Sequence, residues 1–226
     1  MKIIIVNENN YFKKNFKINN VKCYHINDKK NFTLKKIKKI NPNILFFPHW
    51  HWKVDKKIIE KYLCIGFHCA PLPKGRGGSP IQNQIIRGKK NTEICAIKFN
   101  NIIDGGPVYI RKKFKLNGNA NEIFLRLYKD ISKMINRLVK NLTTPIAQKG
   151  KVEFLKRRTP EQSEIDFKNF SIEKIFNHIR MLDLDFKNFP KAFVNIGSFK
   201  IIFSNIKKEK KNLVSKVKII RLKNKN

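Results

Sequence analysis

Short apolar runs alternate with segments of helical periodicity through the first half of the chain. Residues 2–6, 44–47 and 64–67 are continuous apolar runs of strand length, typical of strands buried on both faces of a sheet. Between them, residues 34–40 and 55–62 carry apolar side chains at helical spacing. Strands that alternate with helices pair in parallel, so the pattern predicts an α/β fold with a doubly wound, mostly parallel sheet. Ligands then bind at the carboxyl ends of its strands.

The second half adds two strands, a long helix and a smaller β-rich region. Residues 93–99 and 108–114 favour strands, and residues 121–142 form an amphipathic helix with one apolar and one basic side. We therefore expect a main domain over residues 1–147 and a small C-terminal β-rich domain over residues 148–226. The C-terminal domain should contain a helix that is capped by Ser171 and ends at Leu182, a hairpin that turns at residues 197–198 and another strand at residues 213–222. A disordered tail is expected at residues 223–226.

A proline- and glycine-rich loop follows the strand that ends near His68. Pro71 and Pro73 require extended backbone, so the chain cannot continue as a helix. Ser79 is expected to cap a helix that begins at Pro80. The glycines of the loop and Arg76 favour an anion or a developing negative charge near this helix start.

His68 and Asp104 are the candidate chemical groups. Asp104 follows His68 by 36 residues, in a turn of the form Asp-Gly-Gly. An imidazole at a strand end with a carboxylate in reach is a common general base near neutral pH. The alternative interpretation makes His68 a hydrogen-bonded core histidine beside a rigid turn.

Two ordered motifs resemble the formyltransferases that use 10-formyltetrahydrofolate, a family that includes methionyl-tRNA formyltransferase and the sugar N-formyltransferases. The resemblance covers residues 44–116. Its first motif, His-x-x-x-Leu-Pro-x-x-Arg-Gly-x-x-Pro, is followed at the family spacing by Asp-x-Gly. In the family, an Asn-x-His pair acts with that aspartate, whereas this chain has Gly66 at the asparagine position. The matching residues are His68, Leu72, Pro73, Arg76, Gly77, Pro80, Asp104 and Gly106.

The resemblance implies a Rossmann-like formyltransferase domain that transfers a formyl group to a primary amine. His68 would take the proton from the amine, and Asp104 would orient the imidazole and stabilise its charged form. Glycine offers no side chain to the oxyanion of the intermediate, so another donor is needed. The open candidates are the Gly66 N–H and the side chains of Gln82, Asn83, His49 and His51.

The expected co-substrate is 10-formyltetrahydrofolate. Indole faces at a strand end can stack on a pterin, but two tryptophans can equally cap the core where the sheet ends. Zinc binding is disfavoured because no Cys-x-x-Cys or His-x₃-His spacing occurs, so no metal is expected and the cysteines should be buried thiols. The predicted folate contacts are His49, Trp50, His51, Trp52, Arg76, Gly77, Ile102 and Ile103.

The formal net charge of +34 favours anionic partners. Lysines occur in all the predicted elements, so a general compositional bias explains the charge equally well. The short C-terminal region favours a small amine, most plausibly on a nucleotide-linked amino deoxysugar, over the tRNA of methionyl-tRNA formyltransferase. A non-catalytic folate- or RNA-binding relative is a third possibility. We expect a cytoplasmic enzyme without a membrane partner, and a homodimer is left open.

Overall fold

The computed structural model describes residues 1–8, 11–185 and 190–222, so the predicted tail at 223–226 lies outside the described residues. The chain forms two compact units, and each is assembled from separate segments. The division into domains expected near residue 147 stays a prediction. The first unit contains Met1–Gly77, Glu93–Phe114 and Arg126–Phe154, and the second contains Gly78–Thr92, Lys115–Leu125 and Leu155–Asn226.

A six-stranded sheet organises the first unit, with strand order β2-β1-β3-β4-β6-β7. The pairs β1–β2, β1–β3 and β3–β4 are parallel, whereas β4 and β6 are antiparallel. The middle of β6 lies opposite the carboxyl end of β4, because Cys95 pairs with His68. The strands are β1 (Lys2–Val6), β2 (Lys22–Ile26), β3 (Ile44–Pro48), β4 (Leu63–His68), β6 (Asn91–Lys98) and β7 (Val108–Lys115).

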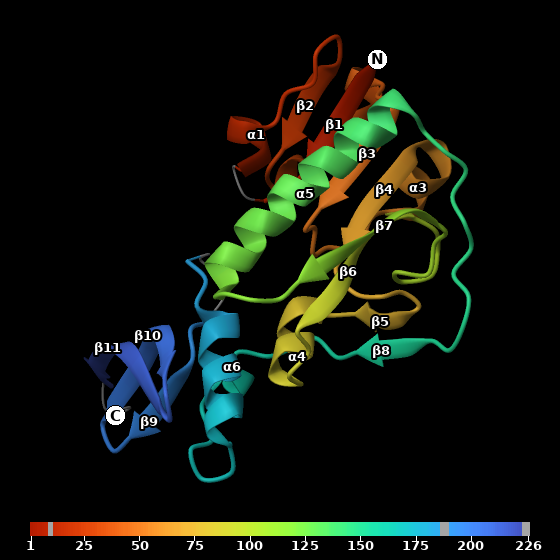
Figure 1. The fold of residues 1–226 in the computed structure, drawn as a ribbon. Coiled ribbons are helices and arrows are strands. Elements are labelled where there is room, and N and C mark those ends of the chain that lie inside the picture. Colours follow the sequence, from red (N-terminus) through yellow and green to blue (C-terminus); the bar gives the residue numbers. More distant parts are fainter. Residues whose placement is uncertain (9–10, 186–189, 223–226) are drawn as a thin grey trace. The chain divides into compact units, whose positions relative to one another are not determined.

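Helices cover both faces of this sheet. On one face, Ile37 of α2 (Leu34–Ile40) and Ile58 of α3 (Lys56–Lys61) lie in one buried cluster with strand residues such as Leu45. On the other face runs α5 (Ala120–Lys140) (Figure 1). Its apolar side is buried, including Leu127, Ile131 and Ile135. Burial of these side chains supplies the main stabilising term, at roughly 25 cal/mol per Å² of apolar surface removed from water. Shorter elements are α1 (Tyr11–Asn15), η1 (Lys29–Asn31) and β5 (Lys74–Gly77), which pairs with β8 (Glu153–Leu155).

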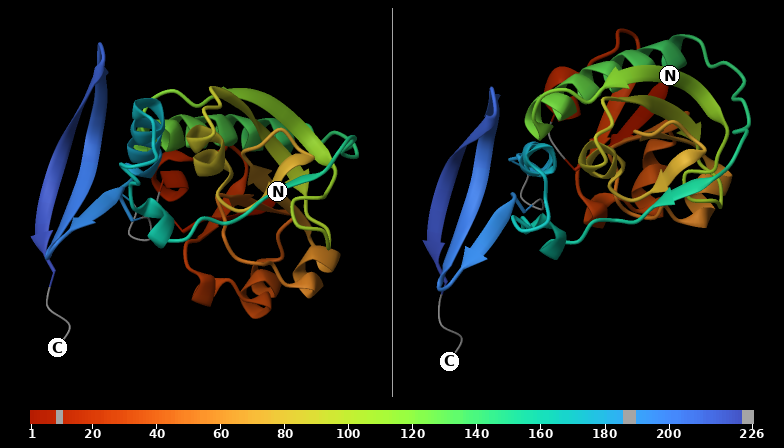
Figure 2. Two further views of the ribbon diagram at one scale, coloured as in Figure 1. Left: turned by 90° about the horizontal axis from the view of Figure 1, so that it is seen from below. Right: turned by 60° about the horizontal axis from the view of Figure 1, so that its bottom comes forward.

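The C-terminal part of the second unit is an antiparallel sheet of three strands, in the order β11-β10-β9. Figure 2 shows β10 and β11 as a long ribbon with β9 at its side. The register shifts between Ser204 and Lys207, where Asn205 has a φ of 50°. This unit contains α4 (Pro80–Ile86), η2 (Glu161–Ser163), α6 (Ile172–Leu182), β9 (Phe193–Ile196), β10 (Phe199–Glu209) and β11 (Asn212–Arg221).

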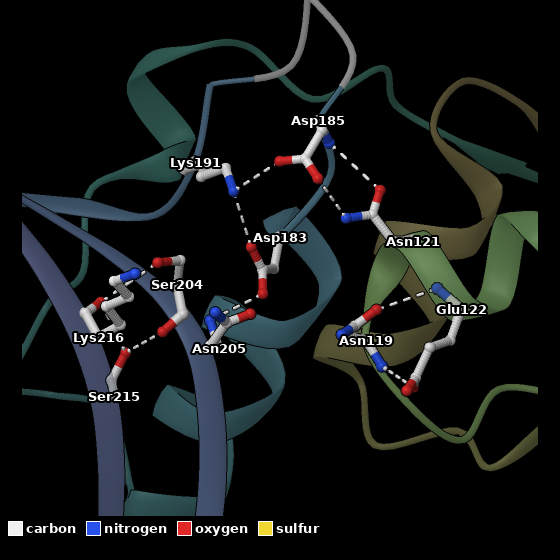
Figure 3. A network of polar contacts seen from close by, with 10 residues as sticks. All are labelled: Asn119, Asn121, Glu122, Asp183, Asp185, Lys191, Ser204, Asn205, Ser215 and Lys216. Carbon is white, nitrogen blue, oxygen red and sulfur yellow. Dashed lines mark hydrogen bonds and ion pairs between the residues drawn. The ribbon is translucent and has the colours of Figure 1, made fainter.

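A polar network fixes the end of α6 to the C-terminal sheet. The buried Asp183 carboxylate accepts from Lys191 Nζ at 2.9 Å and from the Asn205 backbone N–H at 2.8 Å (Figure 3). Asp185 accepts from Lys191 Nζ at 2.9 Å and from the Asn121 amide at 2.8 Å. Because Asp183 receives both a cation and a backbone donor, its buried charge is compensated, as a buried charge must be.

The sequence-based fold class is confirmed, including the mostly parallel sheet and the C-terminal β module. Ser79 is the N-cap residue of α4, as expected, but its side chain makes no capping hydrogen bond. It has a φ of 48°, and its Oγ accepts from the Arg158 backbone N–H at 3.1 Å. The helix still begins at Pro80, whose fixed φ suits the first helical turn. Within the part of the chain described, no helix is long and apolar enough to cross a membrane.

Candidate active site

His68 and Asp104 meet at the carboxyl end of β4. The distance from His68 Nδ1 to Asp104 Oδ2 is 3.4 Å, and the His68 side chain is 9% exposed against 21% for the Asp104 side chain. His68 is the last residue of β4, and Asp104 lies in the turn between β6 and β7. β6 is the neighbour of β4 in the sheet and β7 is the next strand, so residues 36 positions apart in sequence can come together.

Both ring nitrogens of His68 face hydrogen-bond acceptors. Nδ1 faces the Asp104 carboxylate, and Nε2 lies 2.7 Å from the Gly75 carbonyl oxygen. A neutral imidazole has one N–H and can satisfy only one acceptor, whereas the imidazolium donates to both. The Asp104 carboxylate is placed to receive the Nδ1–H and so to orient the imidazole.

The Asp104 turn is rigidly built. Asp104 has a φ of 50°, a left-handed conformation that aspartate tolerates better than most residues. The Gly77 N–H donates to Asp104 Oδ2 at 2.9 Å and so fixes the carboxylate. A Cβ at Gly106 would stand 1.7 Å from the Lys98 carbonyl oxygen, so only glycine allows this close approach of two backbones.

Gln148 connects the turn to the glycine-rich loop, and the sequence analysis did not identify it. Its Oε1 accepts from Arg76 Nε at 3.2 Å and Nη2 at 2.8 Å. Its Nε2 donates to the Asp104 carbonyl at 2.7 Å and the Gly106 carbonyl at 2.8 Å. The residue lies in an irregular segment without periodicity or motif, which left no sequence signal to find it.

Phe99 occupies the space beside Gly66. A Cβ at Gly66 would lie 2.1 Å from Phe99 Cε1 and 2.6 Å from Phe99 Cζ. Gly66 is in the middle of β4 and pairs with Phe47 and Ile97 on its two sides. A larger residue at this position therefore requires the Phe99 ring to move.

The candidate oxyanion donors differ in how they are engaged. Asn83 Nδ2 donates to the carbonyls of Gly78 and Lys156, which uses both its hydrogens. Gln82 Nε2 is buried and has no partner among the described residues. His49 Nδ1 lies 3.1 Å from the Tyr128 hydroxyl, and the His49 and His51 rings are 4.4 Å apart. Both N–H groups of the Asn83 amide are therefore used, and Asn83 can donate to an oxyanion only by breaking one of these hydrogen bonds.

The predicted folate-contact segment after β3 divides into inward and outward residues. Trp50 packs on the core beside Phe32 at a centroid distance of 5.4 Å, which agrees with the core-capping alternative. Trp52 is 39% exposed; its Nε1 donates to Glu8 at 2.9 Å and Lys29 Nζ lies 4.6 Å from its ring. Trp52 is therefore the indole of this segment with exposed surface for stacking.

The other predicted folate contacts lie next to Asp104 or bind its turn. Arg76 contacts Gln148, and Gly77 contacts the Asp104 carboxylate. Ile102 and Ile103 immediately precede Asp104 and are 57% and 69% exposed. The Ile102 carbonyl accepts from the Gly105 N–H at 3.0 Å, which closes the turn. Two large apolar side chains thus stand in solvent beside the carboxylate.

The buried thiols are poor nucleophiles. Burial raises the pKa of Cys64 to about 12 and, as the largest effect, raises the pKa of Cys95 to about 11. Both thiols are therefore protonated at neutral pH, and only the thiolate reacts. All four cysteines are thiols and none is part of a disulfide. Residues 1–8, 11–185 and 190–222 contain no group of three His, Cys, Asp or Glu side chains that could hold a metal ion.

The chain belongs to the formyltransferase family, as its likeness to solved and curated formyltransferases shows. In particular, it resembles methionyl-tRNA formyltransferases. The structure of methionyl-tRNA formyltransferase from Clostridium thermocellum is 38% identical, covers 98% of this chain and 99% of that chain, and has a TM-score of 0.91. A family model described as the C-terminal domain of methionyl-tRNA formyltransferase matches residues 160–220.

Two further matches set the limits of the comparison. The methionyl-tRNA formyltransferase of Thermodesulfovibrio yellowstonii is 30% identical over 155 residues, covering 65% of this chain and 50% of that protein. The chain thus spans about half the length of the curated relatives it matches. A sugar N-formyltransferase from Shewanella is 15% identical with a TM-score of 0.66, covering 87% of this chain and 93% of that chain. At this level of identity, the similarity shows a common fold and does not indicate a common substrate.

Proposed function

We propose that this protein transfers the formyl group of 10-formyltetrahydrofolate to the amino group of methionyl-tRNA. The observation that carries the proposal is the His68–Asp104 pair, 3.4 Å apart, in a chain whose whole length follows a methionyl-tRNA formyltransferase structure. This substrate replaces the nucleotide-linked amino deoxysugar as the preferred acceptor, since the sugar enzymes resemble this chain in fold alone.

The chemistry assigned to each residue follows from the bonds that change. The amine nitrogen attacks the formyl carbon, the C–N bond forms, and the carbonyl electron pair moves to oxygen. His68 accepts a proton from the amine at Nε2, where the amine takes the place of the Gly75 carbonyl oxygen, while Nδ1–H donates to the Asp104 carboxylate. Collapse of the intermediate breaks the bond to the folate nitrogen, and His68 returns the proton to that leaving nitrogen. A positioned base contributes roughly 10²–10⁴ in rate.

The predicted folate contacts complete the donor side of the proposal. Ile102 and Ile103 offer exposed apolar surface beside Asp104, and Trp52 offers an exposed indole. Arg76 and Gly77 hold the turn that carries Asp104. His49 and His51 stay candidate contacts from the same strand end as Trp52. The proposed enzyme uses folate as a co-substrate, and no metal has a role in these steps.

The charge of the C-terminal hairpin supports a tRNA acceptor. Residues 199–221 contain eight lysines and arginines but only one acidic residue, Glu209. Lys216 and Lys218 on β11 are exposed. Cationic side chains of this kind bind the phosphate backbone in a salt-dependent manner.

Acceptor competition tests the proposal. We expect the purified protein to formylate methionyl-tRNA with 10-formyltetrahydrofolate, with a KM that rises steeply with salt, and to leave a nucleotide amino-sugar unmodified. Formylation of the sugar but not the tRNA would reverse the choice of acceptor, and folate binding without transfer to either amine would favour the non-catalytic relative.

A charge-reversal pair tests the hairpin separately. The double variant Lys216→Glu/Lys218→Glu should raise KM for methionyl-tRNA several-fold at low salt, because two phosphate contacts are replaced by repulsion. The matched control, Lys35→Glu/Lys38→Glu, makes the same charge change at exposed positions of α2. Equal effects in the two variants would mean that overall charge, not the hairpin, attracts the tRNA.

A further inference from the structure

We propose that Gln148 is the positioning residue of the site, and that it acts by holding the Asp104 turn where its carboxylate meets His68. The inference rests on the proposed formyl transfer. None of the four hydrogen bonds of Gln148 reaches the His68 ring or the Asp104 carboxylate. Its four hydrogen bonds instead join two backbone segments that must stay in register.

The amide of Gln148 is matched to its surroundings atom by atom. A primary amide has one acceptor oxygen and two N–H donors. The oxygen receives two N–H groups of the Arg76 guanidinium, and the nitrogen supplies the Asp104 and Gly106 carbonyls. Neither a carboxylate nor an alkyl chain of the same length satisfies all four partners. Glutamine is thus specified by the site rather than tolerated there.

The turn needs such support because its backbone is unfavourable on its own. Asp104 has a positive φ, a conformation that is unfavourable for residues other than glycine. The Gly77 N–H fixes the carboxylate of Asp104, while Gln148 fixes the Asp104 carbonyl. Arg76, the partner of Gln148, and Gly77 are consecutive residues of β5. One short strand therefore fixes Asp104 at both its backbone and its side chain.

Loss of the Gln148 amide should loosen Asp104 without removing it. A misplacement of about 1 Å in a site of this kind can cost up to about 10²-fold in rate. We expect Gln148→Met to lower kcat about tenfold or more and to change KM for methionyl-tRNA little. The control Gln162→Met makes the same chemical change at an exposed glutamine of η2, and should keep kcat.

A double-mutant cycle separates positioning from general damage. If Gln148 works through Asp104, Gln148→Met should have almost no further effect on kcat in an Asp104→Asn background. The same fold-loss in both backgrounds would overturn the proposal. Gln148→Glu is the second variant: it keeps an acceptor for Arg76 but sets an oxygen against two carbonyls, so wild-type turnover in this protein would also overturn it.

NMR of the His68 ring tests the role of Gln148 without measuring formyl transfer. NMR signals of the His68 ring should move in Gln148→Met protein in the same direction as in Asp104→Asn protein, because both lose the carboxylate from Nδ1. Unchanged His68 signals in the Gln148→Met protein would refute the positioning role. If the wild-type protein formylates no amine, the proposed function fails. The NMR measurement would still show whether Gln148 holds Asp104 against His68.

Discussion

Two buried histidines, one in each compact unit, show how surroundings decide what an imidazole can do. His68 is 8% exposed and has an acceptor at each ring nitrogen, one of them a carboxylate. His178 is 1% exposed; its Nε2 faces the Ser163 carbonyl at 3.2 Å, and its buried Nδ1 has no partner among the described residues. His68 thus has an anionic partner for one N–H, whereas burial disfavours the charged form of His178. Burial by itself therefore does not identify a general base.

The pKa of His178 shows the cost of burial without a carboxylate. Burial is the largest effect and lowers this pKa from 6.5 to about 4, the Ser163 carbonyl partly opposes it, and Arg158 and Lys174 lower it further. A neutral histidine that donates one N–H to a carbonyl is a core residue. His178 is therefore a hydrogen-bonded core histidine, the alternative interpretation that the sequence left open for His68.

The largest expected effect comes from removing each histidine in turn. His68→Gln should lower kcat for formyl transfer by about 10²–10⁴, because no base takes the amine proton. His178→Gln should leave kcat within about twofold. Steady-state kinetics of both variants, with circular dichroism to confirm folding, checks the contrast. Comparable losses of kcat in the two proteins would show that His68 and His178 do not differ in their roles.

The carboxylate is the next element of the comparison. Asp104→Asn keeps the shape of the turn but replaces the anion facing His68 Nδ1 with a neutral amide. We expect kcat to fall by at least about 10², as an imidazole base loses both its orientation and the stabilisation of its charged form. Pre-steady-state transfer of labelled formyl measures the chemical step, and near-native rates would remove Asp104 from the mechanism.

The sheet beside His68 can be tested by adding an amide at Gly66. Gly66→Asn should lower the free energy of unfolding by about 1–3 kcal/mol, since its Cβ would stand 2.1 Å from the Phe99 ring. In a Phe99→Ala background the same Gly66→Asn change should cost less than in the wild-type protein, because the ring no longer fills the space. Urea denaturation compares the proteins. A Gly66→Asn variant with the free energy of unfolding of the wild-type protein would show that Phe99 does not exclude a side chain at this position.

The smallest expected effect is a pH dependence of stability that arises from His178. Between pH 6.5 and about 4 the unfolded chain binds a proton at this residue that the folded protein excludes. Its contribution to stability is therefore fully present above about pH 6.5 and falls as the pH drops through that window, by about 1.4 kcal/mol per pH unit. Between pH 7 and pH 5 the wild-type protein should lose about 2 kcal/mol more than His178→Gln. Parallel losses in urea titrations would contradict this.

The sequence predicted those features that depend on local patterns. The apolar runs predicted β1, β3 and β4, and the two ordered motifs predicted that His68 and Asp104 would meet. It could not predict Gln148, whose partners are backbone carbonyls and a guanidinium from distant segments. It also could not predict that Phe99 would stand against Gly66. Contacts made by irregular segments or by ring packing depend on tertiary structure, which residue patterns do not encode locally.

The turn behind Asp104 also decides where this enzyme can be redesigned. With 1.7 Å between a Gly106 Cβ and the Lys98 carbonyl oxygen, and a Gly105 Cβ only 2.4 Å from Ile102 Cγ2, neither glycine accepts a side chain without moving the backbone. Ile102 and Ile103, by contrast, project into solvent one and two residues before the carboxylate. A library that seeks altered donor or acceptor preference should randomise those two isoleucines and leave the glycines fixed.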